Sequence, residues 1–188
     1  AMRTRMFTPQ ALLARLQSDL GTVSPLLATL TSGPRDMPER QQTLRGMIAW
    51  SYNLLTDQEK YFLQAAAFFR SGFEIQTLAQ VAAVPENEAE QVVESLVDKN
   101  LIQSSRDSQM RFYLLESIRE FAIERARDAG VWEKLQAEFI FVYCVLMQNA
   151  ANDIETSDGS KSTTWIKSEN KNLLAALDRA LNSENEEV

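Results

Sequence analysis

The sequence contains no histidine, and this absence excludes several kinds of active site. Without an imidazole, neither a Ser-His-Asp nor a Cys-His catalytic arrangement can form, and zinc loses one of its usual ligands. The sequence also lacks a GxxxxGK(S/T) phosphate-binding loop and a GxGxxG dinucleotide-binding motif. We therefore predict that the chain itself is not an enzyme and holds no cofactor and no metal ion.

Cysteine is nearly absent as well. The single cysteine, Cys144, lies in the apolar run of residues 139–147, so no disulfide can form within the chain and we expect a buried thiol. That run is too short to cross a membrane, and the first ten residues lack the apolar core of a signal peptide. These features predict a cytoplasmic protein without a membrane partner.

Positive charge is scarce too. The chain has 19 lysines and arginines against 26 aspartates and glutamates, which gives a formal net charge of −7. A free-standing nucleic-acid-binding protein normally presents a basic face to the phosphates. Direct nucleic-acid binding is therefore not expected. The low numbers of glycine (six) and proline (five) leave few turns and favour a mainly α fold.

Helical patterns begin close to the first residue. Thr8 and Pro9 predict the start of a helix, and leucines follow at helical spacing. A Gly-Pro pair then interrupts the pattern. We assign residues 1–32 to an N-terminal helical remnant and residues 33–42 to a connector.

Residues 43–130 carry the pattern of a winged helix, in which helices are followed by a two-stranded β-wing. The first helix should start near Thr43. Trp50 and Tyr52 can lie in the core on one face of it, or Trp50 can cap the cleft between the winged helix and its neighbour. Thr56 and Glu59 have the spacing of a capping box, which predicts the start of the second helix.

The rest of this region completes the winged-helix pattern. A short helix is expected over residues 77–83, and a longer one after Pro85. The apolar period then changes to two over residues 101–103 and 110–114, which predicts a β-hairpin. A last helix should end near Gly130.

The helix after Pro85 is the element that a DNA-binding winged helix would place in the major groove. Here it carries one lysine, Lys99, against five carboxylates: Glu86, Glu88, Glu90, Glu94 and Asp98. The expected wing offers only Arg106 and Arg111, offset by Asp107. Because these carboxylates would repel phosphates, we interpret the winged helix as a protein-contact module.

Residues 131–188 read as a separate helical hairpin of the TPR type. One helix is expected from Trp132 to Ala151, and a polar loop over residues 153–164. A second helix follows from Trp165, and its inward stripe should be four leucines: Leu173, Leu174, Leu177 and Leu181. A single hairpin resembles the start of a helical-repeat array.

The connector and the residues after it alternate in charge. Arg35, Arg40 and Arg45 are interspersed with Asp36 and Glu39. This alternation is typical of a solvated linker, but it also suits a segment that docks in an interdomain groove, where arginine pairs with carboxylates. The sequence leaves both interpretations open.

Three blocks of the chain resemble a known family. Residues 32–82 (SGPRDMPERQQTLRGMIAWSYNLLTDQEKYFLQAAAFFRSGFEIQTLAQVA) and 110–130 (MRFYLLESIREFAIERARDAG) are similar to the region after the nucleotide-binding core of bacterial NB-ARC-type STAND ATPases. These include regulators of the SARP and LuxR types. A third block, Trp165 with ENKNLLAALDRAL, is similar to the first repeat of the family's helical sensor arm.

The resemblance implies that the chain is a non-catalytic regulatory fragment of a signal-transduction ATPase. In this family the winged helix folds back on the ATPase core and controls the switch to the active assembly. ATP or ADP and Mg²⁺ would be bound by the upstream domain, of which residues 1–32 would be the end. The implied partners are that upstream domain, downstream helical repeats and other protomers.

The resemblance also implies an interdomain latch. Many relatives carry a Met-His-Asp motif whose histidine touches ADP, and here Leu114, Leu115 and Glu116 occupy those positions. Leu115 cannot bond a phosphate, so Glu116 and Arg119 are expected to pair instead with the ATPase core or with the connector arginines Arg35, Arg40 and Arg45. A DNA-binding transcription factor and a stand-alone protein-interaction domain are the alternative functions.

Overall fold

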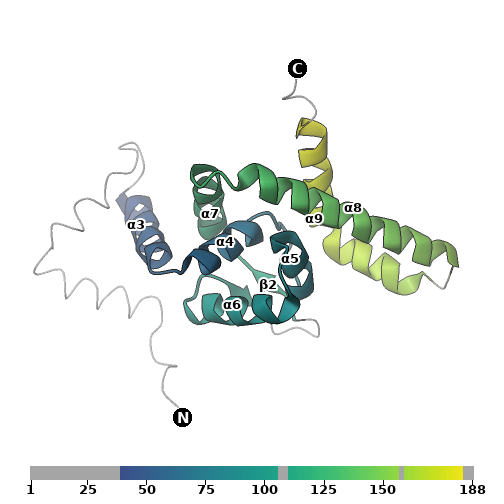
Figure 1. The fold of residues 1–188 in the computed structure, drawn as a ribbon, viewed down its shortest axis with the longest axis horizontal. Coiled ribbons are helices and arrows are strands. Elements are labelled where there is room, and N and C mark those ends of the chain that lie inside the picture. Colours follow the sequence, from purple (N-terminus) through teal and green to yellow (C-terminus); the bar gives the residue numbers. More distant parts are fainter. Residues whose placement is uncertain (1–38, 106–109, 157–158, 184–188) are drawn as a thin grey trace, which may run out of the picture. The chain divides into compact units, whose positions relative to one another are not determined.

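The computed structural model describes residues 39–105, 110–156 and 159–183 (Figure 1). The predicted N-terminal helix and Arg35 lie outside these residues. The chain divides into two compact units, Ala1–Ala49 and Trp50–Val188. The described residues are mainly α-helical, with seven helices and one two-stranded sheet.

Helix α3 (Glu39–Asn53) begins four residues before the predicted start at Thr43. Trp50 and Tyr52, the two aromatic residues near the end of this helix, differ in burial. Tyr52 is buried, with its ring 5.4 Å from that of Phe121 and its hydroxyl oxygen accepting a 2.7 Å hydrogen bond from Gln64 Nε2. Trp50 is 58% exposed, so it is not a core residue, and its alternative role at a cleft beside the winged helix stays a prediction.

Helix α4 (Asp57–Ala66) starts with the predicted capping box. The Glu59 backbone N–H donates to Thr56 Oγ1 at 3.2 Å, and the Thr56 N–H donates to Glu59 Oε2 at 2.8 Å. Two N–H groups at the helix start are thereby satisfied. Glu59 also receives a 2.6 Å hydrogen bond from Ser95 Oγ and an ion pair from Lys99, so it ties α4 to the end of α6.

Helices α5 (Ile75–Ala82) and α6 (Glu86–Asp98) pack with α4 around the core of this region. The buried residues of α6 recur every three or four positions: Ala89, Val92, Val93 and Leu96. Four of the five carboxylates of α6 lie on its exposed side, and Glu88 is half-buried. The predicted acidic surface of this helix is therefore confirmed.

Strands β1 (Gln103–Ser104) and β2 (Phe112–Tyr113) form the predicted antiparallel hairpin, with Gln103 paired to Tyr113. Residues 106–109 of its turn are outside the described part. A further bridge joins Phe112 to Phe73, through two N–H···O bonds of 2.9 Å. The segment after α4 therefore lies beside β2.

Helix α7 (Glu116–Asp128) follows the hairpin as expected. Helices α8 (Trp132–Thr156) and α9 (Ser160–Ser183) lie side by side (Figure 1). Because α8 ends at Thr156 and α9 begins at Ser160, most of the predicted loop of residues 153–164 is helical, and that prediction was wrong. Cys144 is exposed rather than buried, because it lies on the side of α8 opposite the core residues Phe139 and Val142.

The orientation of α9 is the largest departure from expectation. Three of its four stripe leucines, Leu174, Leu177 and Leu181, are more than half exposed. The buried face instead carries Glu169, Asn172 and Ala176. Polar contacts with the rest of the chain, described below, decide which side of this helix is buried. No helix among the described residues is long and apolar enough to cross a membrane.

The surroundings of Glu59 predict a loss of stability in acid. Burial alone would raise its pKa, but the bonds from Lys99, Ser95 and the Thr56 N–H outweigh burial and lower the pKa from 4.5 to about 2. Because the folded pKa is depressed, the stabilisation is present above pH 4.5 and is lost as the pH falls towards 2. We expect Glu59→Gln to remove on the order of 3 kcal/mol at neutral pH and to flatten this acid dependence.

Urea unfolding of both proteins over a pH series measures the effect. Glu90→Gln, which neutralises an exposed carboxylate of α6, is the control and should leave the pH dependence unchanged. Parallel pH profiles of the wild type and Glu59→Gln would contradict the assignment.

Candidate functional site

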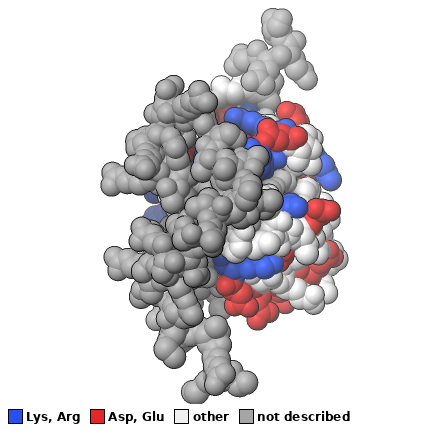
Figure 2. Space-filling view, turned by 90° about the vertical axis from the view of Figure 1, so that its left-hand side faces the viewer, with Lys and Arg blue, Asp and Glu red and all other residues white. Residues whose placement is uncertain are grey.

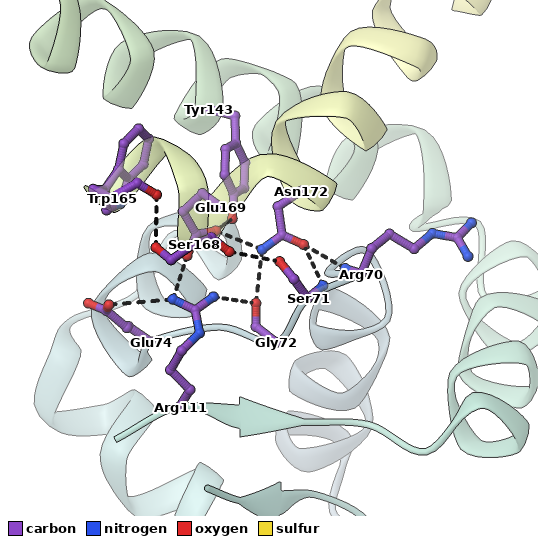
Figure 3. A network of polar contacts seen from close by, with 10 residues as sticks. All are labelled: Arg70, Ser71, Gly72, Glu74, Arg111, Tyr143, Trp165, Ser168, Glu169 and Asn172. Carbon is purple, nitrogen blue, oxygen red and sulfur yellow. Dashed lines mark hydrogen bonds and ion pairs between the residues drawn. The ribbon is translucent and has the colours of Figure 1, made fainter. Parts of the chain in front are cut away.

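A buried network of polar residues joins the turn after α4 to the α8–α9 hairpin (Figure 3). On the side of the turn, the network is centred on the carbonyl oxygen of Gly72, which accepts hydrogen bonds from Arg111 Nη2 at 3.0 Å and Asn172 Nδ2 at 2.9 Å. Gly72 has a φ of 81°, and a Cβ there would lie 2.5 Å from the Tyr113 ring. Only glycine fits this position without a shift of its neighbours.

Arg111 supplies the positive charge of the network. It directly precedes β2, and its Nη1 lies 2.5 Å from Glu169 Oε1 and 3.6 Å from Glu74 Oε1. Both partners in the short ion pair are more than nine-tenths buried. Burial alone would lower the pKa of Arg111, but the hydrogen bond and charge of Glu169 outweigh it and raise the pKa above its ordinary value.

Asn172, on α9, connects the α8–α9 hairpin to the turn after α4. Its Oδ1 accepts the backbone N–H groups of Arg70 at 2.6 Å and Ser71 at 3.0 Å. Its Nδ2 donates to Gly72 O and, at 2.7 Å, to Glu169 Oε2. The amide is fully buried, and each of its atoms is satisfied, so the side chain has one allowed orientation.

Tyr143 completes the network from α8. Its hydroxyl donates to Glu169 Oε2 at 2.6 Å. Burial and, next, the charge of Glu169 raise the pKa of Tyr143, so it stays protonated and remains a donor. Ser71 adds a contact of its Oγ with the Ser168 carbonyl at 3.4 Å.

The contacts of Glu169 attach the α8–α9 hairpin to the rest of the unit. Glu169 receives a cation, a hydroxyl and an amide, and these partners offset the cost of burying its charge. Tyr143 and Asn172 belong to the hairpin, whereas Arg111 lies outside it and, like Asn172, also contacts the Gly72 carbonyl, so the network fixes the hairpin against the turn. No group of three or more metal-ligating side chains was found among the described residues.

An apolar groove lies on the α8–α9 hairpin. It has a volume of about 300 Å³ and is lined almost wholly by apolar atoms, from Ile140, Tyr143, Cys144 and Met147 of α8 and five residues of α9: Leu173, Leu174, Ala176, Leu177 and Ala180. The exposed stripe of α9 leucines borders this groove. The hairpin thus presents an apolar surface beside the polar network.

The predicted latch residues fall into two groups. Glu116 and Arg119 pair with each other through an ion pair one turn apart on α7, and the hydrogen bond from Arg119 lowers the pKa of Glu116. Leu115, just before α7, is exposed. Arg40 lies in α3 and Arg45 belongs to the other compact unit, so their predicted role in the latch stays a prediction.

Sequence reasoning missed the network residues. Arg111 was predicted to be a cation of the wing surface, but it is buried against Glu169. Glu169 and Asn172 lie one turn apart on α9, but their pattern is indistinguishable from that of a solvated polar face. Only the positions of the turn and of β2, which are distant in sequence, reveal the partners.

The surface charge is mixed. On the described part of the face drawn in Figure 2, acidic and basic side chains are interspersed, and no continuous basic area is visible. The exposed carboxylates of α6 are spaced four residues apart at Glu86, Glu90, Glu94 and Asp98, so they form one acidic stripe.

Comparisons place the chain near transcriptional regulators. It is 36% identical over 105 residues to a Mycobacterium tuberculosis protein provisionally named HTH-type transcriptional regulator Rv0890c, which covers 54% of this chain and 12% of that protein. It is 28% identical over 144 residues to the uncharacterized protein Mb0918 of Mycobacterium bovis, covering 74% of this chain and 35% of the relative.

The chain therefore spans only a small part of the relatives it matches. No family model and no solved structure matches it. The chain is therefore similar to part of a transcriptional-regulator-like helical protein.

The network predicts a strong, paired effect on stability. Arg111→Leu leaves the buried Glu169 without its cation and should lower the free energy of unfolding by about 3–5 kcal/mol. Glu169→Leu leaves the buried Arg111 without its carboxylate partner and should lower the free energy of unfolding by a similar amount. The double variant should cost much less than the sum, because neither charge is then left buried alone.

Chemical unfolding of the four proteins gives the coupling free energy. Arg125→Leu is the matched control, since it removes an arginine whose pair with Asp128, at 2.8 Å, is partly exposed, and it should cost less than about 1 kcal/mol. Equal losses for Arg111→Leu and Arg125→Leu would contradict the role assigned to the network.

Proposed function

We propose that the chain is a non-catalytic regulatory module of an NB-ARC-type STAND ATPase that controls transcription. In this proposal α3 to α7 and the β1–β2 hairpin form a winged helix, which docks on the nucleotide-binding core. Helices α8 and α9 begin a TPR-like sensor arm. The upstream core would bind ATP or ADP with Mg²⁺.

The observation that carries the proposal is the buried network around Arg111 and Glu169. It couples the region from α4 to α7 with the α8–α9 hairpin through satisfied polar contacts. A movement of the arm is therefore passed to the winged helix rather than absorbed between them. Such coupling is what a two-state docking mechanism requires, since a signal on the arm must bias the position of the docked domain.

The charge of α6 supports protein docking over DNA reading. Its exposed side carries the acidic stripe, and pressing four carboxylates towards phosphates would be repulsive. Arg111, which the sequence offered as a wing cation, is buried in an ion pair and unavailable to a phosphate. In the proposal this surface faces protein or solvent.

The apolar face of the hairpin supports the placement of the downstream repeats. Leu174 and Leu177 are exposed and line the groove between α8 and α9, and Leu181 is exposed one turn further along α9. In helical-repeat proteins each hairpin buries such a face against the next one. The downstream helical repeats are thus the proposed partner of this face.

Glu116 is the proposed contact with the nucleotide-binding core. Its side chain is 66% exposed although it pairs with Arg119, so it can also reach an arginine of another domain. Leu115 beside it is exposed and adds an apolar contact. This pair of residues would replace the phosphate-sensing histidine of the family.

DNA binding is the second candidate function, and the name of the Mycobacterium tuberculosis relative favours it. The matched region covers 12% of that protein, so a helix-turn-helix elsewhere in it would account for the name equally well. The two functions make opposite predictions for this chain.

We expect two results if the regulatory function is right. In the longer protein that contains the ATPase core, Glu116→Arg should accelerate ADP release and raise basal activity several-fold, because it turns the latch contact repulsive. Glu120→Arg, an exposed position on the same helix, is the control and should change neither. A gel shift of this chain with duplex DNA at low salt should show no binding.

Salt-sensitive binding to duplex DNA would favour the second function. Unchanged ADP retention and basal activity in Glu116→Arg would remove the latch from the proposal.

A further inference from the structure

Arginines from different elements lie around a pair of tilted aromatic rings, Trp132 and Phe68. The ring of Trp132 lies 4.6 Å from that of Phe68. The guanidinium of Arg127 lies 4.7 Å from the Trp132 ring centroid, and that of Arg179 lies 5.4 Å from it and 5.0 Å from the Phe68 centroid. Two cations from different helices, α7 and α9, thus share one aromatic surface.

Arg70 lies beside them. It follows Phe68 by two residues, and its N–H donates to Asn172, which precedes Arg179 by seven residues on the same side of α9. Its side chain is exposed, and Figure 3 shows it directed away from the polar network. The three residues, here called the arginine cluster, come from the turn after α4, from α7 and from α9.

The arginine cluster is short of negative charge. Arg111, Arg119 and Arg125 all form ion pairs, but within the described ranges none is formed by Arg70, Arg127 or Arg179. Asp178 is the acidic group that acts on Arg179, and Glu116, near Arg70, is already paired with Arg119.

The like charges affect one another. Arg179 Nε is buried without a hydrogen-bond partner. Burial and, next, the charge of Arg70 lower the pKa of Arg179 to about 10, so the Arg179 side chain stays charged at neutral pH. The cluster therefore carries a desolvation and repulsion cost that a bound anion would relieve.

We propose that the arginine cluster is a docking site for a carboxylate-rich segment of a protein partner. Guanidinium groups that lie over aromatic rings can keep N–H groups free, and these groups match carboxylates in bidentate geometry. The half-buried Trp132 supplies an apolar contact that a peptide can also use. The acidic chain as a whole, with a net charge of −7, disfavours long polyanions such as nucleic acid.

The chain itself contains a segment of the required chemistry. The acidic stripe of α6 presents a carboxylate on each turn, at positions 86, 90, 94 and 98. A labelled synthetic peptide with the sequence of residues 85–99 is therefore a suitable probe. A version of the peptide with these four carboxylates changed to amides is the matched control.

Fluorescence anisotropy with the whole chain at low salt tests the proposal. The acidic peptide should bind, its amide version should not, and added salt should weaken binding. Arg70→Glu and Arg127→Glu, both at exposed positions, should each weaken binding by about tenfold or more. Lys171→Glu makes the same charge change at an exposed site of α9 and should alter binding by less than about twofold.

Circular dichroism and thermal unfolding establish that each variant is folded, and Arg70→Gln gives a milder second variant. If sedimentation of the chain alone shows self-association that Arg70→Glu abolishes, a second copy of this chain is the partner. The proposal is overturned if the acidic peptide does not bind, if Lys171→Glu weakens it as much as Arg70→Glu, or if inorganic phosphate or duplex DNA competes for the cluster more tightly than the peptide.

Discussion

The buried ion pair between Arg111 and Glu169 is the interaction on which the arrangement of the longer compact unit depends. Two charges removed from water are stabilising only when their remaining hydrogen-bonding groups are also satisfied. The Gly72 carbonyl accepts a hydrogen bond from Arg111 and Glu74 adds a longer ion pair, whereas Tyr143 and Asn172 donate hydrogen bonds to Glu169. Because each partner has a fixed direction, the pair defines the register of the α8–α9 hairpin against the rest of the unit. An apolar contact of the same area would tolerate sliding.

The polar attachment explains why α9 buries its less apolar side. The side chain of Asn172 accepts the N–H groups of Arg70 and Ser71, and turning the leucines inward would leave these groups unpaired and would separate Glu169 from Arg111. The cost of unpaired buried groups exceeds the gain from covering a few exposed leucines. The leucines are consequently left on the surface, where the proposed downstream repeats would cover them. In the proposed function, the α8–α9 hairpin is rigidly attached to the region from α4 to α7 on one side and binds a partner on the other. A movement of that partner is therefore transmitted to the region from α4 to α7.

Local signals in the sequence predicted the local structure well. The capping box of Thr56 and Glu59, the hairpin of β1 and β2 and the acidic surface of α6 each depend on residues that are close in the chain. The orientation of α9, the burial of Arg111 and the exposure of Cys144 could not be predicted, because they depend on partners about 30 to 100 residues away. The leucine stripe was misleading for the same reason, since helical period reveals an apolar face but not what lies against it. The winged-helix and TPR-like interpretations rest on element order and remain part of the proposal.

The central claim is that the α8–α9 hairpin and the region from α4 to α7 behave as one cooperative unit. Native-state hydrogen exchange of the Arg70 and Ser71 N–H groups, which both donate to Asn172, tests it most directly. The account predicts that these amides and the core amides of α6 and α9 exchange through the same opening, with the free energy of global unfolding. Exchange of the Arg70, Ser71 and α9 amides through a lower-energy opening that leaves α6 protected would contradict it.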